Sequence, residues 1–345
     1  MAEPIPIRNI YYLLCYAWNR LDEGAVVDVS GVDTTELADL FATVLIGGVH
    51  HLTRRGLDQG YELHEEELSS IRGRIDVARS ARRMLMHHGK AACQFDELTV
   101  NTLPNQILKS TLRYLAGVQG LDGKLRKQLV ALHRDLRGIE DAPLTRQLFR
   151  KVQLHSNNRF YKFLLNICEL VRESWLVDER SGQYKFRDFI RDERRMAHLF
   201  EEFIRNFYKS ERPDLESRKE IIYWTAQSLT DPSLKLLPTM ETDISVRSPD
   251  KTLIIDAKYY SKTLSSYYDS QSIHSANLYQ IFAYLKNLEV RGGNDARAEG
   301  MLLYPVVDRP IREEYEMHGH KIRICTIDLS QDWRDIRSDL LALVA

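Results

Sequence analysis

Residues 241–258, ETDISVRSPDKTLIIDAK, predict a β-hairpin that carries charged side chains in apolar surroundings. The stretch Ser248-Pro249-Asp250-Lys251 is a turn signal, because proline presets φ at the second turn position and serine suits the first. With proline and aspartate as the central pair, Asp243 lies opposite Asp256. The same register places Glu241 opposite Lys258.

The predicted register brings like charges together. Strand alternation places Asp256 and Lys258 on one face of the hairpin, and Leu253, Ile255 and Ala257 on the other. Directly opposed Cβ atoms lie about 5 Å apart, where two carboxylates repel unless a cation lies between them. The alternative is a solvated surface hairpin. The apolar neighbours favour a buried sheet, in which unpaired charge is costly, so we interpret the hairpin as a metal site.

Composition indicates a soluble globular protein. The chain has 345 residues, of which 43% are hydrophobic and 28% charged, and its length suits two domains. No apolar run approaches the ~20 residues that span a bilayer, and the N-terminus does not resemble a signal peptide. We expect a cytoplasmic protein without membrane contact. The four cysteines are far apart in sequence and predict neither a zinc site nor disulfides.

The net charge of −1 hides an uneven distribution. Residues 70–151 contain 16 Lys or Arg against 7 Asp or Glu. Such a basic region suits contacts with phosphates, and it equally suits an acidic surface of a partner protein. The sequence leaves both alternatives open.

Apolar periodicity divides the chain into residues 1–155 and 156–345. The first part predicts helices at 11–18, 37–45 and 104–137 and short strands at 61–65 and 71–77, which together make an α+β domain. The second part predicts an α/β fold, with a mixed central sheet flanked by helices. Its expected elements are helices 161–175, 195–208, 277–288 and 333–344, the hairpin, and strands 300–304 and 322–327.

Four further polar residues are candidate accessory residues. Glu201 lies on the predicted helix 195–208, where it either points toward the hairpin or is a solvated helix charge. Gln280 and Tyr284 are four residues apart and so share a helix face, where they bond a phosphate or a catalytic side chain unless they are ordinary surface. Glu241, opposite Lys258, either tunes that lysine or forms a simple surface ion pair.

Together these motifs resemble a known family. Asp243, Asp256-Ala257-Lys258 and Gln280-x-x-x-Tyr284 resemble the PD-(D/E)xK nuclease superfamily. More specifically, the segments METDI and IIDAKYY are similar to the McrC family, the nuclease subunits of McrBC restriction systems. The N-terminal segments IRNIYY, IRGRI, FDE and NQILK agree, so the resemblance covers most of the chain. Thr242 stands where the superfamily name places a proline, a departure that puts little in doubt because proline is not a ligand.

The resemblance implies a C-terminal PD-(D/E)xK fold and a Mg²⁺-dependent endonuclease. By this similarity, Asp243 and Asp256 are the metal ligands, Lys258 is the catalytic lysine, and Glu201 is a looser match to a helical glutamate. The partner implied is an McrB-like hexamer, an AAA+ GTPase that moves double-stranded methylated DNA, recognises the modified base and is stimulated by residues 1–155. The chain lacks a GxxxxGK[ST] motif, so we expect the partner, and not this chain, to bind GTP.

Two other functions remain open from sequence alone. One is a non-catalytic regulatory subunit that keeps a nuclease-like fold, which the intact Asp243, Asp256 and Lys258 disfavour. The other is a DNA repair nuclease of the same superfamily, which the N-terminal similarities disfavour. Because a double-strand break needs two active centres, we also expect dimerisation through the nuclease domain or paired complexes.

Overall fold

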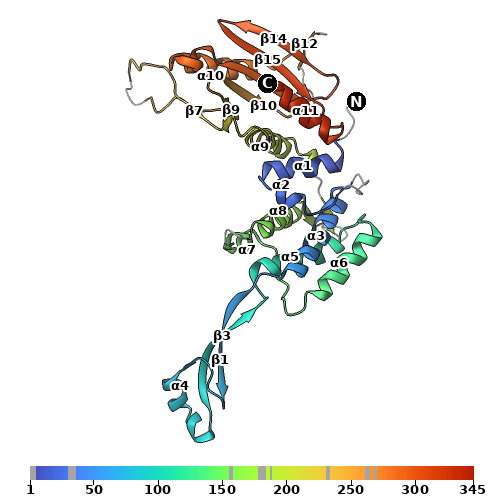
Figure 1. Cartoon of the computed structure of the whole chain (residues 1–345), viewed down its shortest axis with the longest axis vertical. Coiled ribbons are helices and arrows are strands. Elements are labelled where there is room, and N and C mark those ends of the chain that lie inside the picture. Colours follow the sequence, from blue (N-terminus) through green and yellow to red (C-terminus); the bar gives the residue numbers. More distant parts are fainter. Residues whose placement is uncertain are drawn as a thin grey trace. The chain divides into compact units, whose positions relative to one another are not determined.

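The computed structural model describes residues 5–29, 36–154, 158–177, 184–186, 189–230, 234–260, 265–267 and 270–345. The chain forms two compact units (Figure 1). Unit 1 contains residues 1–25, 29–40 and 187–345, and unit 2 contains residues 26–28 and 41–186. The boundary expected between residues 155 and 156 lies outside the described residues and differs from this division. Residues 1–25, which were expected in the first domain, belong to unit 1 together with residues 187–345.

Unit 1 is built around a six-stranded mixed sheet. The strand order is β14-β15-β13-β10-β9-β6, in which β10, β13 and β15 are parallel and the other neighbours antiparallel. A mixed sheet flanked by helices was predicted, and this part of the fold class is confirmed. The strands are β6 (Glu216–Arg218), β9 (Ile244–Arg247), β10 (Thr252–Ala257), β13 (Glu299–Pro305), β14 (Arg312–Met317) and β15 (His320–Ile327).

The hairpin of β9 and β10 has the predicted register. Arg247 pairs with Thr252 and Ile244 with Ile255, and the turn is closed by a 2.9 Å bond from the Ser248 N–H to the Lys251 carbonyl. At the end away from the turn, the ladder stops at the Ile244–Ile255 pair. Asp243 and Asp256 are the next residues beyond that pair. The sequence of the turn was therefore enough to predict which residues lie at the end of this ladder.

Helix α10 (Ser275–Glu289) covers one face of this sheet. It contacts β10 and β13, and its Ile281 and Leu285 pack with Ile254 of β10 in one apolar cluster. Gly300 of β13 permits this close approach, because a Cβ there would lie 2.9 Å from Ile281 Cδ1. Since Asp256 is two residues from Ile254, strand alternation turns its side chain toward the same face.

The other helices of unit 1 include one from the start of the chain. Tyr16 of α1 (Ile7–Ala17) packs on Phe203 and Phe207 of α9 (Glu193–Glu211), with ring centroids 5.8 and 5.2 Å apart. Asn9 donates to the carbonyls of Leu329 and Gln331 at 2.8 and 2.9 Å, close to the start of α11 (Trp333–Leu343). The short elements are α2 (Leu21–Gly24), η2 (Phe189–Arg191), β7 (Ile221–Ile222), β8 (Met240–Glu241), β11 (Ser265–Tyr267), β12 (Ser270–Ser272) and η3 (Gly293–Arg297).

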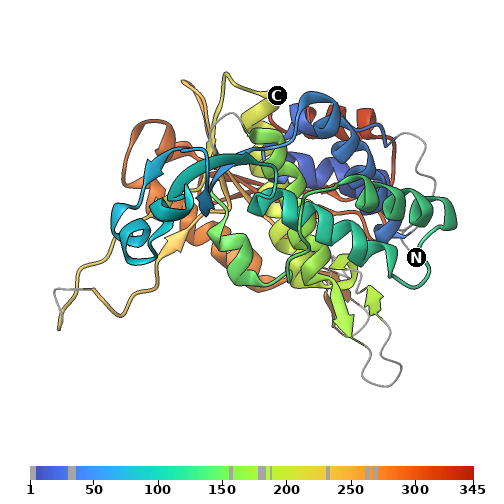
Figure 2. The same cartoon turned by 90° about the horizontal axis from the view of Figure 1, so that it is seen from below.

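Unit 2 combines a helical part with a projecting three-stranded sheet (Figures 1 and 2). Helix α5 packs against α6 and α8, and α3 approaches α8 where Gly48 meets Leu164. The helices are α3 (Leu37–Arg55), which begins in unit 1, then α5 (Leu103–Ala116), α6 (Gly123–Asp135), α7 (Arg146–Lys151) and α8 (Arg159–Glu173). Strands β4 (Trp175–Val177) and β5 (Tyr184–Phe186) complete the unit.

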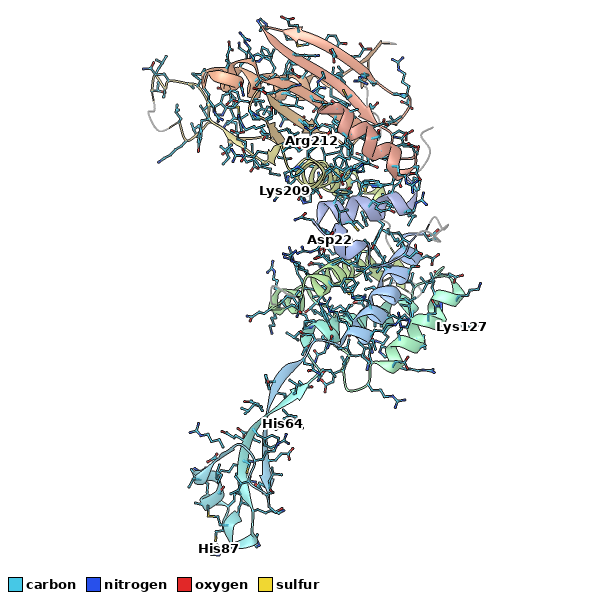
Figure 3. All side chains as sticks on the ribbon, viewed as in Figure 1. Asp22, His64, His87, Lys127, Lys209 and Arg212 are labelled. Atoms are coloured by element: carbon cyan, nitrogen blue, oxygen red, sulfur yellow. The ribbon has the colours of Figure 1, made fainter. Side chains whose placement is uncertain are left out.

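We call residues 60–99 of unit 2 the finger. It contains β1 (Gly60–Leu68), β2 (Arg74–Ile75), α4 (Val77–Arg82), η1 (Leu85–His88) and β3 (Ala91–Thr99). His64 lies along its length and His87 at the end distant from α3, α5 and α8 (Figure 3). The buried Asn105 fixes its base by donating to the carbonyls of Asp58 and Val100 and accepting from the Tyr161 hydroxyl. A buried, fully bonded amide holds the two chain segments in place.

All four cysteines are buried and free. Across the part of the chain that the structure describes, no helix has the length and apolar character that a membrane crossing needs.

Candidate functional site

The three charged residues predicted from the hairpin come together at the end of β10. The Lys258 ammonium lies 2.8 Å from Asp256 Oδ1 and 3.3 Å from Asp243 Oδ2. Asp243 Oδ2 also accepts a 3.1 Å bond from the Ala257 N–H. The lysine therefore supplies the positive charge that two neighbouring carboxylates require.

Burial controls the charge of Asp256. Its side chain is fully buried, whereas those of Asp243 and Lys258 keep 17% and 19% exposure and connect the cluster to solvent. Burial raises the pKa of Asp256 to about 7, despite the opposing effect of Lys258, and the nearby Asp243 charge adds to the rise. Burial alone would lower the pKa of Lys258, but the charges of Asp256 and Asp243 outweigh it and raise that pKa. Lys258 is therefore a protonated, cationic group at neutral pH.

The donor set fits a hard divalent cation. Asp256 Oδ2 is buried and has no hydrogen-bond partner among the described residues, which is unusual for a carboxylate oxygen. Within the described ranges, no cluster of three or more His, Cys, Asp or Glu side chains is placed to hold a metal ion. Two carboxylates nevertheless suffice for Mg²⁺, which keeps several waters and commonly uses one or two carboxylates together with substrate phosphates.

Helix α10 places Gln280 and Tyr284 beside the cluster. Gln280 Nε2 donates to the Tyr284 hydroxyl at 2.7 Å, and that hydroxyl donates to the Glu241 carbonyl at 2.9 Å. Burial raises the pKa of Tyr284, and the negative charges of Asp256 and Asp243 contribute to the rise. The pair is thus not ordinary helix surface, and it bonds backbone next to Asp243.

Among the described residues, Lys258 forms its ion pairs with the two aspartates and not with the other two accessory candidates. Glu201 forms ion pairs with Arg205 and Lys219, at 3.3 and 2.5 Å, so its membership of the site stays a prediction. Glu241 belongs to β8, which pairs with β7, and its side chain is exposed. The expected pairing of Glu241 with Lys258 is not part of the ladder, because regular pairing of the hairpin ends at Ile244 and the lysine bonds the two aspartates.

Sequence patterns missed the contacts that hold Asp243 in place. Thr242 is buried and bonds both the N–H and the carbonyl of Glu220. The signal was visible in the sequence as a threonine directly before Asp243, but its partner, Glu220, lies in the two-residue link between β6 and β7, which has no periodicity of its own.

The fold and this cluster define a mixed α/β protein whose sheet brings two aspartates and a lysine together. Comparison with known proteins identifies its relatives. The family described as "McrBC 5-methylcytosine restriction system component" matches residues 8–305. The chain belongs to this family, and the resemblance to McrBC restriction systems stated from sequence is confirmed.

Two relatives illustrate the similarity. A protein from Escherichia coli (strain K12), described as "Type IV methyl-directed restriction enzyme EcoKMcrBC", is 38% identical over 342 residues, which span 99% of this chain and 98% of that protein. A chain in the half-complex from a tetradecameric assembly of Thermococcus gammatolerans McrB AAA+ hexamers with bound McrC resembles this structure with a TM-score of 0.62. That match is 18% identical and covers 98% of this chain and 76% of the other, so it supports the fold alone.

The burial of Asp256 predicts a pH-dependent effect of Asp256→Asn on stability. Because the folded pKa of about 7 lies above the ordinary value of 3.8, the wild-type chain loses stability as pH rises between these values. Asparagine does not titrate, so the free energy of unfolding of Asp256→Asn should exceed that of the wild type by about 1–3 kcal/mol above pH ~8 and approach it below pH ~4. Urea unfolding in EDTA across this range measures the difference.

The matched control is Asp250→Asn, which changes an exposed aspartate in the turn of the same hairpin. Its effect on unfolding should not vary with pH. A difference between Asp256→Asn and wild type that stays constant from acid to neutral pH would contradict the account of the buried carboxylate.

Proposed function

We propose that this chain is the Mg²⁺-dependent endonuclease subunit of a methylcytosine-dependent restriction complex. The observation that carries the proposal is the shared contact of one protonated lysine with two carboxylates at the end of a buried strand. Membership of the McrBC restriction family supports the biological setting. A PD-(D/E)xK nuclease fold, with Asp243, Asp256 and Lys258 as the acidic residues and lysine of its motif, accounts for both the charged cluster and the family membership.

Each residue has a role that follows from its chemistry. Asp243 and Asp256 would hold Mg²⁺, and the unbonded Asp256 Oδ2 is an available ligand atom. When bound, Mg²⁺ supplies Lewis-acid polarisation of the scissile phosphate. The Lys258 ammonium, partly exposed beside both carboxylates, donates hydrogen bonds to the phosphate and stabilises its developing negative charge. The Ala257 N–H orients the Asp243 carboxylate.

A protein partner is the better explanation of the finger. Its arginines are largely paired within the finger, with Arg72 on Glu97, Arg79 on Glu65 and Arg83 on Glu67. Of the 17 large apolar side chains exposed among the described residues, seven lie in these 40 positions: Tyr61, Leu63, Ile71, Val77, Met84, Met86 and Leu98. Apolar exposure with internally neutralised charge suits a protein surface more than phosphates.

We therefore assign contact with the AAA+ GTPase hexamer, and stimulation of its GTPase, to unit 2 and chiefly to its finger. The solved relative contains McrB AAA+ hexamers with bound McrC, which is the kind of partner proposed here. In this proposal the partner hexamer binds GTP, recognises methylated double-stranded DNA and moves it to the nuclease centre of unit 1.

Loss of the charged cluster should separate cleavage from partner activation. Asp243→Ala, Asp256→Ala and Lys258→Ala should each lower cleavage of methylated plasmid DNA by about 100-fold or more in the presence of partner, GTP and Mg²⁺. Stimulation of the partner GTPase should stay at the wild-type level, because the finger is unchanged. Asp250→Ala, in the turn of the same hairpin, should cleave normally.

The same assay distinguishes the alternative functions. Full cleavage by any of the three variants would rule out the assigned centre. A wild-type complex that stimulates GTP hydrolysis but cleaves no DNA would favour a regulatory subunit, and equal cleavage of unmethylated DNA ends would favour a repair nuclease.

Removing the finger tests the partner assignment. Gly60 and Thr99 are direct antiparallel partners, so residues 61–98 can be replaced by an Asn-Gly turn without separating the flanking segments. The shortened chain should lose stimulation of the GTPase and DNA cleavage while it keeps the unfolding transition of unit 1. Steady-state GTP hydrolysis measures the first effect, with Asp256→Ala as the control that keeps stimulation. Undiminished stimulation would show that the partner contact lies elsewhere.

A further inference from the structure

The strand segment that leads into Asp243 contains one more residue than its neighbour. Residues 216–222 run antiparallel to residues 240–247, with Arg218 paired to Ser245 and Ile221 paired to Glu241. Between these two pairs, residues 219–220 face the three residues 242–244. An extra residue of this kind is a β-bulge, which re-aims a side chain and recurs beside active sites. Asp243 is the middle residue of the longer side.

Thr242 holds the first position of this bulge by two bonds to one residue. Its N–H donates to the Glu220 carbonyl at 2.9 Å, and its hydroxyl oxygen accepts from the Glu220 N–H at 3.0 Å. In a regular ladder a main-chain carbonyl would accept that second bond, so here a side chain replaces it. The hydroxyl also shares a 2.9 Å bond with Ser245 Oγ, and Thr242 is only 1% exposed, so water does not compete.

Glu220 is itself held firmly. Arg247 Nε and Nη2 donate to its two carboxylate oxygens at 3.0 and 3.1 Å, and Arg291 Nη1 donates at 2.5 Å. Arg247 also bonds Asp295 at 2.7 Å. Paired charge-assisted bonds of this kind fix position more strongly than neutral ones. Thr242 is therefore attached to a residue that is immobilised from the other side.

The residue after Thr242 in the bulge is Asp243, whose carboxylate lies in the charged cluster. That group accepts from the Ala257 N–H and contacts the Lys258 ammonium, and the adjoining Glu241 carbonyl accepts from the Tyr284 hydroxyl. Glu241 is thus bonded to α10, Thr242 to Glu220 in the link between β6 and β7, and Asp243 to the end of β10. Thr242 is the residue whose bonds to Glu220 hold the bulge in place.

The superfamily pattern named from the sequence has proline at this position. Proline has neither an N–H nor a hydroxyl, so it can make neither of the two bonds to Glu220. Threonine makes both, and serine carries the same two groups. This chain therefore fixes the residue before Asp243 by a side-chain hydrogen bond that a proline could not make.

We infer that Thr242 is a positioning residue that aims Asp243 at the divalent cation, through its double bond to Glu220 across the bulge. The inference rests on the proposed function, since it assumes that Asp243 is a metal ligand. Groups that orient ligands from outside the metal's own contacts commonly change metal affinity by about 10-fold to 100-fold.

The test is Mn²⁺ binding to the full chain, measured by isothermal titration calorimetry with a short DNA duplex present. Thr242→Val keeps the size and the N–H but removes the hydroxyl, and should raise the Mn²⁺ dissociation constant about 10-fold. Thr242→Ser should bind within about 2-fold of wild type. The matched control is Thr111→Val, which removes another fully buried hydroxyl, bonded to the Ile107 carbonyl at 2.7 Å within α5, and should leave Mn²⁺ affinity unchanged.

The outcomes are distinct. Wild-type affinity in Thr242→Val, or an equal loss in Thr111→Val, overturns the role of Thr242 while the proposed function stands. If Thr242→Val does not fold, Thr242→Cys, whose thiol accepts hydrogen bonds weakly, should raise the constant in the same direction, and unchanged binding overturns the inference. A wild-type chain that binds no Mn²⁺ and cleaves no DNA overturns the proposed function and this inference with it.

Discussion

The end of β10 in unit 1 is organised around three charges, with one lysine in contact with two aspartates. A carboxylate as deeply buried as Asp256 is costly unless a cation lies beside it, and Lys258 provides that cation two residues along the same chain. Asp243 adds a second negative charge, which the single lysine shares. Such a cluster is poorly suited to stabilising a fold but well suited to accepting a divalent ion and a phosphate, and function is the better explanation of its presence.

The surrounding sheet supplies the rigidity that this cluster needs. Helix α10 covers the face to which Asp256 points, and close contact at Gly300 leaves little space between helix and strand. At the other end of the hairpin, Arg247 joins Glu220 to Asp295, so the strand that bears Asp243 is bonded along its length. The bulge at residues 242–244 interrupts this regular pairing beside Asp243.

Local patterns predicted the elements whose signal is long or chemically specific. The turn at Ser248–Lys251 gave the register from Arg247 to Ile244, and the long helices α8, α9 and α10 follow from their apolar periodicity. Strands β6 and β7 are two or three residues long and have no period, and β14 is an exposed, charge-rich edge, so none of these three was predicted. Glu241 was misplaced because the register was extended through a bulge. The packing of α1 on α9 joins residues nearly 200 positions apart, which no local pattern records.

The central claim is that Asp243 and Asp256 together bind the divalent ion used for phosphodiester hydrolysis. The most direct measurement is anomalous diffraction from crystals of the full chain grown with Mn²⁺ and a short DNA duplex. The account predicts an anomalous peak in contact with the carboxylates of both aspartates, with Lys258 displaced from at least one of them. A peak bound elsewhere, or density that keeps Lys258 on both carboxylates while DNA is cleaved, would contradict it.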